Sequence, residues 1–276
     1  MTFLITTLIE DKSCDPQLIA QSGLSLLVEG DGRKFVYDTG QSPMFLFNAR
    51  AMGLDPTGAD ALIFSHGHWD HTGGAAVLIS EPAPPKSIYL GRGFFDRKFR
   101  KFEGGRVEIS SYLSRTAIER SGIPCHEVGN ELVQLSENAW LLAGFTPQDE
   151  MEIPSNGLVR EENGALVTDR FLDEIALILR GREGLTVISG CSHIGSISVC
   201  KGVESACGEP VFRFIGGMHL GKASEEKIEH TCKVLRGMGV RSLGSCHCTG
   251  PRAEAFFEQN FPGFFRTNVG ARTQII

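Results

Sequence analysis

Residues Ala61 to Gly74 read ALIFSHGHWDHTGG, and this stretch decides the fold. A short apolar run predicts a buried strand, and it leads directly into three histidines and one aspartate within six residues. Imidazole and carboxylate groups are typical ligands of transition metals. Four ligands on so short a loop are crowded for one ion, so two adjacent ions are the easier arrangement. The alternative, a polar surface turn, fits poorly with three of the chain's eight histidines in one place. The cluster consists of His66, His68, Asp70 and His71.

Composition limits the possible classes of protein. With 276 residues, 41% of them apolar, the chain can bury a large core, and we expect one domain over residues 1–276. A net charge of −6 argues against a general binder of nucleic acid or of acidic membranes. The N-terminal MTFLITTLIEDK predicts a first strand rather than a signal peptide, and no segment is apolar over the length of a membrane span. We therefore expect a cytoplasmic protein with reduced cysteines. The oligomeric state stays open.

Strand and helix patterns alternate along the chain, which predicts an α/β fold with mixed sheets. Residues 24–29 and 34–37 read as a hairpin, and residues 43–52 as a helix. Further strands are expected near residues 87–90, 139–142, 175–179, 186–189, 211–215 and 242–245, and further helices near residues 112–121, 195–206, 224–237 and 252–260.

Two stretches, residues 91–111 and 146–173, lack a clear period and are expected to be lids or binding loops. The first contains the one dense basic segment of this acidic chain, residues 91–106. Its arginines can contact phosphate and its phenylalanines can cover a flat ring, so we expect Arg92, Arg97 and Arg100 to bind substrate. A basic amphipathic helix packed by its phenylalanines is the alternative.

The motif His66-Gly67-His68-Trp69-Asp70-His71 resembles the hallmark of the metallo-β-lactamase superfamily. The resemblance implies a four-layer αββα sandwich that holds one or two transition-metal ions at one edge. Zinc is the first expectation, with iron and manganese as alternatives. Asp38, at the end of the hairpin, matches the acid that supports a ligand histidine from beneath in that superfamily.

The resemblance also implies further ligands downstream. His193 and His247 each lie in a small-residue turn after a predicted buried strand, and we expect both to bind metal. His219 occupies the same kind of position and is a candidate ligand or catalytic residue, whereas His126 and His230 are expected to be structural. The motifs Gly-Cys-Ser-His, Gly-Gly-Met-His-Leu and His-Cys-Thr-Gly around these histidines resemble the branch of dihydropterin synthase-like enzymes linked to methanopterin biosynthesis.

One departure from the lactamase pattern is visible in the sequence. The usual Gly-His-Thr motif would fall at residues 143–146, which read AGFT and contain no histidine. In the lactamase pattern two motifs supply metal ligands in this part of the chain. Here His193 must take the place of both, or one ion is loosely held or absent. We expect Cys246 and Cys248 to pack away from the site, and the role of Cys191 stays open. Asp173-Glu174 either reaches the site or is a charged strand entry.

These residues favour a metal-dependent hydrolase that acts on a small anionic, phosphorylated substrate, with Asp70 as a possible proton acceptor and His219 as a catalytic candidate. A dihydropterin-type transferase is the first alternative, in which a dihydropterin pyrophosphate condenses with ribofuranosylaminobenzene phosphate. A redox di-metal protein and a non-catalytic metal-binding module are the others.

Overall fold

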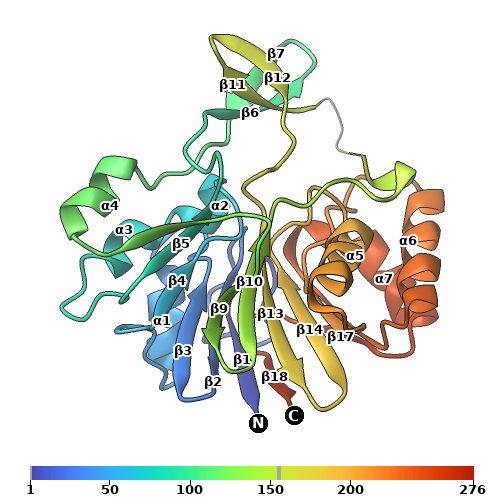
Figure 1. The fold of residues 1–276 in the computed structure, drawn as a ribbon, viewed down its shortest axis with the longest axis horizontal. Helices are drawn as coiled ribbons and strands as arrows, with labels where there is room; N and C mark the ends of the chain where they lie inside the picture. Colours follow the sequence, from blue (N-terminus) through green and yellow to red (C-terminus); the bar gives the residue numbers. More distant parts are fainter. Residues whose placement is uncertain (1, 154–156) are drawn as a thin grey trace.

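Two large sheets pack face to face and carry helices on both outer sides (Figure 1). The structure is a computed structural model that describes residues 2–153 and 157–276. The second irregular stretch expected from the sequence therefore falls partly outside the described residues, at positions 154–156. Both described ends of the chain lie at the same side of the sandwich, opposite the edge that holds the histidine cluster.

The first sheet is mixed, because its early strands form antiparallel hairpins and its later strands run parallel. In spatial order its strands are β18 (Arg272–Ile275), β1 (Phe3–Ile9), β2 (Ser25–Gly30), β3 (Arg33–Tyr37), β4 (Ala61–Ile63), β5 (Ile88–Gly91) and β8 (Cys125–Val128).

The second sheet is mixed in the same way, with antiparallel pairs at one edge and parallel pairs at the other. In spatial order its strands are β17 (Phe264–Arg266), β16 (Ser242–Ser245), β15 (Val211–Gly216), β14 (Gly184–Ser189), β13 (Ile175–Gly181), β10 (Ala139–Ala143) and β9 (Val133–Ser136).

Each sheet carries its own set of helices. The first sheet is covered by α1 (Met44–Ala51), α2 (Trp69–Thr72), α3 (Ala75–Leu78) and α4 (Arg115–Ser121), and the second by α5 (Ser196–Cys207), α6 (Glu225–Met238) and α7 (Pro251–Asn260) (Figure 1). Two short 3₁₀ helices, η1 (Glu150–Glu152) and η2 (His247–Thr249), complete the list. Within the described residues, none of the helices has the length and apolarity that crossing a membrane requires.

Three hydrophobic clusters fill the three interfaces between these layers. One lies between the two sheets, and the other two lie between each sheet and its helices. Strand β13 shows how one strand contributes to two of these clusters. Its residues Ile175, Leu177 and Leu179 face the other sheet, while Ala176 and Ile178 face the helices. A strand whose two faces are both buried must be apolar throughout, as this one is. The four-layer αββα sandwich with mixed sheets is confirmed.

A third, small sheet stands above the edge of the sandwich that holds the histidines (Figure 1). It is formed by β12 (Ala165–Thr168), β11 (Leu158–Glu162), β6 (Lys98–Phe102) and β7 (Gly105–Glu108), in that order. Both irregular stretches of the sequence thus fold into hairpins that pair with each other, with Leu158 opposite Arg100. The alternative of a basic amphipathic helix is wrong, because a turn at Gly104, with φ of +86°, reverses the chain directly after β6.

A side-chain hydrogen bond of Tyr37 joins the two large sheets in the core. The Tyr37 hydroxyl, on β3, donates to the carbonyl oxygen of Ile175, on β13, at 2.6 Å. Tyr37 is fully buried, so its hydroxyl needs a partner. Burial, followed by the nearby charge of Asp38, raises the pKa of Tyr37 well above its usual range, which keeps the hydroxyl protonated and able to donate.

We expect Tyr37→Phe to lower the free energy of unfolding by about 1–3 kcal/mol, because it removes the donor and leaves a buried carbonyl without it. Chemical denaturation followed by circular dichroism measures the change. Tyr112→Phe is the matched control, since the Tyr112 side chain is 69% exposed. Equal stability of the two variants would show that this bond does not hold the sheets together.

Candidate metal centre

The first histidine cluster lies on the turn between β4 and α2, where the chain leaves the core. The rings of His66 and His71 are 4.3 Å apart between centroids, and those of His66 and His68 are 4.4 Å apart. All three residues are buried. Gly67 allows this turn to pack tightly, since a Cβ there would come within 2.2 Å of the Phe94 carbonyl oxygen.

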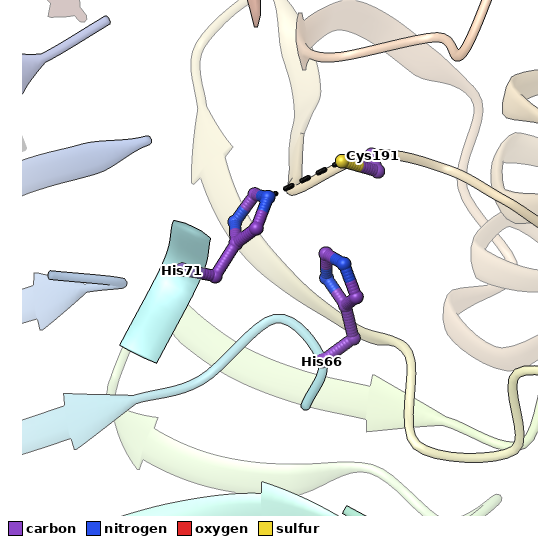
Figure 2. Close-up of side chains that lie close together, drawn as sticks. All are labelled: His66, His71 and Cys191. Carbon is purple, nitrogen blue, oxygen red and sulfur yellow. Dashed lines mark hydrogen bonds between the residues drawn. The ribbon is translucent and has the colours of Figure 1, made fainter. Parts of the chain in front are cut away.

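The second loop follows β14 and brings two more side chains to the cluster. The Cys191 sulfur lies 3.3 Å from Nε2 of His71, as the dashed line in Figure 2 shows. The His193 ring lies 4.9 Å from both the His66 and the His68 ring. A single Gly-Cys-Ser-His loop therefore contributes one side chain to each end of the cluster.

The third loop follows β16 and contributes His247. Its ring lies 5.2 Å from that of His71, and its Nε2 lies 3.5 Å from a carboxylate oxygen of Asp70. Its other nitrogen, Nδ1, lies 2.7 Å from the carboxylate of Asp11. Sequence positions 11, 66–71, 193 and 247 thus converge at one edge of the sandwich.

The converging side chains form two adjacent groups that could each hold a metal ion. His66, His68 and His193 make one group, and Asp70, His71 and His247 make the other, with the candidate ligand atoms of each group within 4.8 Å of one another. Cys191 falls into groups of both kinds, with His66 and His71 and with His247 and Cys248. This arrangement is what a pair of neighbouring ions requires.

Unpaired nitrogens inside the cluster support the fit of metal ions. Among the described residues, Nε2 of His68 and both ring nitrogens of His193 are buried without a hydrogen-bond partner. Buried polar atoms without a partner are rare and costly, so they indicate a missing ligand. Burial, followed by the neighbouring histidines, lowers the pKa of His66, and burial also lowers that of His68 and His193, well below the usual value. Neutral imidazoles offer the lone pairs that a metal needs.

In the pair formed by Asp70 and His247, contacts with neighbouring side chains outweigh the effect of burial on both pKa values. Burial alone would raise the pKa of Asp70, but its hydrogen bond with His247 lowers it to about 2. Burial would likewise lower the pKa of His247, but the carboxylates of Asp11 and Asp70 raise it well above the usual value. Asp70 is therefore ionised at neutral pH and could offer an oxygen to an ion.

Buried acidic side chains hold the first two loops from behind. Asp38 accepts hydrogen bonds from the Ser65 amide and hydroxyl, and it lies 2.7 Å from Nδ1 of His71. Glu174 accepts from the backbone N–H groups of His193 and Ile194, at 2.5 and 3.0 Å. A carboxylate on the far nitrogen of a histidine fixes the ring and raises its basicity toward a metal.

Asp173 holds the first loop in the same way. Its carboxylate accepts from the Gly67 N–H at 2.7 Å and is ion-paired with Lys98 of the small sheet. Both members of the pair are buried. Asp173-Glu174 is therefore more than a charged strand entry, since the two side chains reach the loops of the first cluster and of His193.

Strained backbone is concentrated in the same loops. Among the described residues, positive φ values outside glycine include those of Asp38, Ser192, His219 and His247, at 59°, 51°, 49° and 48°. Such conformations cost on the order of 1–3 kcal/mol each and persist where function fixes them.

His219 lies in the cleft above the cluster. Its ring is 4.4 Å from that of His193, and the residue is exposed to solvent. Although His219 is exposed at the cleft surface, desolvation by the protein atoms around its ring, followed by the charges of His247 and Lys227, lowers its pKa to about 4. The ring is therefore neutral at pH 7 and can accept a hydrogen bond there.

The three arginines expected to bind substrate lie in different surroundings. Arg100 lines the cleft next to His193 and His219. Arg97 is ion-paired with Glu108 and Glu161, within the small sheet. Arg92 is exposed and is not among the residues that line the cleft.

The cleft between the sandwich and the small sheet has two hollows, of about 510 and 480 Å³. They share a wall made of Arg100, Leu158, His193, His219 and Cys248. The larger hollow is cationic and also has a stacked ring pair, Phe171 on His193, whose centroids are 4.3 Å apart; its cations are Arg100, Lys101, Lys222 and Lys227. The smaller hollow contains metal-ligand candidates together with Trp69 and Tyr112.

Comparison with known proteins agrees with this geometry. The family model of the metallo-β-lactamase superfamily matches residues 19–197. The chain belongs to that superfamily. A curated relative from Methanocaldococcus jannaschii, the 7,8-dihydropterin-6-methyl-4-(β-D-ribofuranosyl)-aminobenzene-5′-phosphate synthase, is 33% identical over 96% of this chain and 94% of the relative. This relative confirms the resemblance to the dihydropterin synthase-like branch.

Solved structures of the superfamily align over nearly the whole chain. A metal-dependent hydrolase of the β-lactamase superfamily is 28% identical, with a TM-score of 0.85 and 98% of each chain covered. A diphosphatase of the PhnP family is 14% identical, with a TM-score of 0.59 over 100% of this chain and 98% of the other, and it shows the shared fold alone. The comparisons point to an enzyme and leave open whether water or a second substrate is the acceptor.

The missing superfamily motif has a structural explanation. At the end of β10, Phe145 is buried against α5 where a ligand histidine is usual. Instead, the ring of His193 lies against His66 and His68 and completes their group. Cys191, on the same Gly-Cys-Ser-His loop, lies next to His71 of the second group.

Asp11, Lys98 and Cys248 are site residues that the sequence did not reveal. Asp11 follows β1 and precedes His247 by 236 positions, so no local pattern links the two. Lys98 lies in a segment that reads as irregular. Cys248 was expected to pack, but it lines both hollows, whereas Cys246 is buried in the core between the sheets.

We expect purified protein to contain one or two transition-metal ions per chain, and His68→Ala to remove the ion held with His66 and His193, because two imidazoles bind it far more weakly than three. Elemental analysis after chelator-free preparation measures the content. His126→Ala, at an exposed position on β8, is the control. Metal-free protein that takes up none on reconstitution would contradict this prediction.

We expect Asp11→Asn to weaken the metal position that His247 serves by about 10–100-fold, because the ring loses the carboxylate that orients it. Titration with zinc against a chromophoric chelator gives the affinity. Asp15→Asn, an exposed aspartate four residues away, controls for the change in net charge. Unchanged affinity would mean that the Asp11 contact does not support a ligand.

Proposed function

We propose that this chain is a metal-dependent hydrolase that cleaves a small phosphorylated substrate carrying a flat ring. The observation that carries the proposal is the placement of Arg100, Lys101, Lys222 and Lys227 around one hollow that opens directly onto the histidine cluster. In a chain with a net charge of −6, four cations around one cleft favour an anionic ligand.

The metal ligands in this proposal are His66, His68 and His193 for one ion and Asp70, His71 and His247 for the other, with Asp38 holding His71. Bound zinc, or iron or manganese, would supply Lewis acidity that polarises an ester or phosphoryl oxygen. The ligand set of nitrogens with one carboxylate suits these ions.

The chain's own groups position the substrate and move its protons. The low pKa of Asp70 keeps its carboxylate ionised, so it can accept a hydrogen bond from an incoming nucleophile. His219 is neutral at the wall between the two hollows, where it can orient a polar group of the substrate. Both residues are catalytic candidates because they face the cleft next to the cluster.

Two features divide the recognition of the substrate between the hollows. Arginine and lysine side chains bind phosphate through charge-assisted hydrogen bonds, and Arg100 reaches both hollows. Trp69 and Tyr112, whose centroids are 6.0 Å apart, offer aromatic surface in the smaller hollow for a flat ring. Arg97 supports the small sheet through its ion pairs, and Arg92 contributes charge at a distance.

A dihydropterin-type transferase is the second candidate. Like the hydrolase, a transferase of this kind releases a phosphate or pyrophosphate group from its substrate. It differs in that a second substrate, in place of water, attacks. Two adjoining hollows with a common wall favour it, since each can hold one substrate, and so does the 33% identity to the synthase.

We expect Arg100→Ala to lower kcat/KM for the best anionic substrate by about 10–100-fold, because a hydrogen bond to a charged group contributes about 1.5–3 kcal/mol. The assay compares phosphate esters, pterin pyrophosphates and lactams. Arg120→Ala, an exposed arginine on α4, is the matched control. Faster turnover of a lactam than of every phosphate compound would refute the proposed substrate class.

The same assay separates hydrolase from transferase. Release of phosphate or pyrophosphate is measured with and without an arylamine phosphate as acceptor. Release that needs no acceptor identifies a hydrolase, and release that depends on the acceptor identifies a transferase.

A further inference from the structure

We propose that Cys191 and Cys248 together donate two sulfur ligands to the metal position at His247, which makes this position selective for thiophilic ions. The proposal concerns which ion the centre holds, and it does not depend on the reaction catalysed. The proposal assigns a role to Cys248, whose side chain was expected from the sequence to pack away from the site.

The three side chains are close enough to share one ion. The sulfur atoms of Cys191 and Cys248 and a ring nitrogen of His247 all lie within 4.8 Å of one another. A zinc–sulfur bond is about 2.3 Å and a zinc–nitrogen bond about 2.0–2.1 Å. Two donor atoms bound to one ion can be no farther apart than the sum of their two bond lengths, which agrees with the separations seen here. Cys191 also lies within 4.8 Å of the ring nitrogens of His66 and His71, which places its sulfur between the two groups.

The backbone makes room for the Cys248 sulfur and directs a donor at it. A Cβ at Gly217 would come within 2.6 Å of this sulfur, so a side chain there would displace it. The backbone N–H of His219 donates to the same sulfur at 3.2 Å. Hydrogen bonds from backbone N–H groups stabilise a thiolate, which is the form that binds metal.

Packing does not explain the position of Cys248. Cys246, two residues earlier, shows what a packing cysteine does here, since it is buried in the cluster between the two sheets. Cys248 instead lines both hollows of the cleft. None of the eight cysteines is in a disulfide, so both thiols are available.

Sulfur donors change which ions the centre prefers. Thiolates select zinc, iron, cobalt or cadmium, whereas magnesium and manganese prefer oxygen ligands. A position with two sulfurs and the His247 imidazole therefore binds zinc-like ions and discriminates against manganese.

The test uses cobalt(II) as a spectroscopic probe, added to the full-length protein after removal of bound metal. We expect a near-ultraviolet sulfur-to-cobalt charge-transfer band, and each of Cys191→Ser and Cys248→Ser should lose about half of its intensity, because each removes one of two thiolates. Cys125→Ser, at an exposed free cysteine, should keep the full band. A band that is absent, or unchanged in Cys248→Ser, overturns the proposal.

A second measurement needs no variant and so does not depend on the variants folding. Wild-type protein with and without zinc is alkylated by iodoacetamide, and the modified positions are mapped by mass spectrometry. We expect zinc to protect Cys248 at least tenfold while Cys125 reacts equally in both samples. Equal alkylation of Cys248 with and without zinc overturns the proposal.

Discussion

Several imidazole rings must be held against one another inside the protein, and the rest of this structure follows from that requirement. The rings of His66, His68, His71 and His193 are buried at centroid distances of 4.3 to 4.9 Å where these are closest. Such a cluster leaves polar atoms unsatisfied, and rotation of any ring would destroy the arrangement. The chain meets this requirement with acidic side chains behind the three loops, two of them behind the first. These are Asp38 for His71, Asp173 for Gly67, Glu174 for His193 and Asp11 for His247.

The four acidic residues come from different parts of the chain, and the sandwich itself fixes three of them. Asp38 follows β3, Asp173 and Glu174 precede β13, and Asp11 follows β1. Because β3 and β13 are packed on both faces, the buried Asp38, Asp173 and Glu174 cannot shift without disturbing the core, whereas Asp11 is exposed. Rigid elements hold a site more precisely than loops do. The cations that line the cleft are not held by the two large sheets. They come from the small sheet on one side and from the α6 region on the other.

An α/β fold with mixed sheets could be predicted from the alternating strand and helix patterns, and the αββα sandwich from the resemblance of the compact first motif to the metallo-β-lactamase superfamily. Residues 175–179 are apolar at every position, and His66 to His71 lie within six residues. The small sheet could not be predicted, because Lys98 is buried where the pattern of a strand calls for an apolar residue, and β6 pairs with β11 across more than 50 positions. Asp11 was missed for a related reason, as its partner His247 lies at the other end of the chain and only the fold brings them together.

The buried ion pair between Lys98 and Asp173 has a mechanical consequence for the small sheet. Lifting this sheet as a flap would separate the buried Lys98 from Asp173 and leave that carboxylate in the interior without its cation, at a cost on the order of 3–5 kcal/mol. At that cost a raised form makes up less than about one molecule in a hundred. The small sheet is then a fixed cover over the cleft. The size of a compound that can lie against the histidines is therefore limited by the side chains that line the two hollows, such as Tyr112 and Lys222.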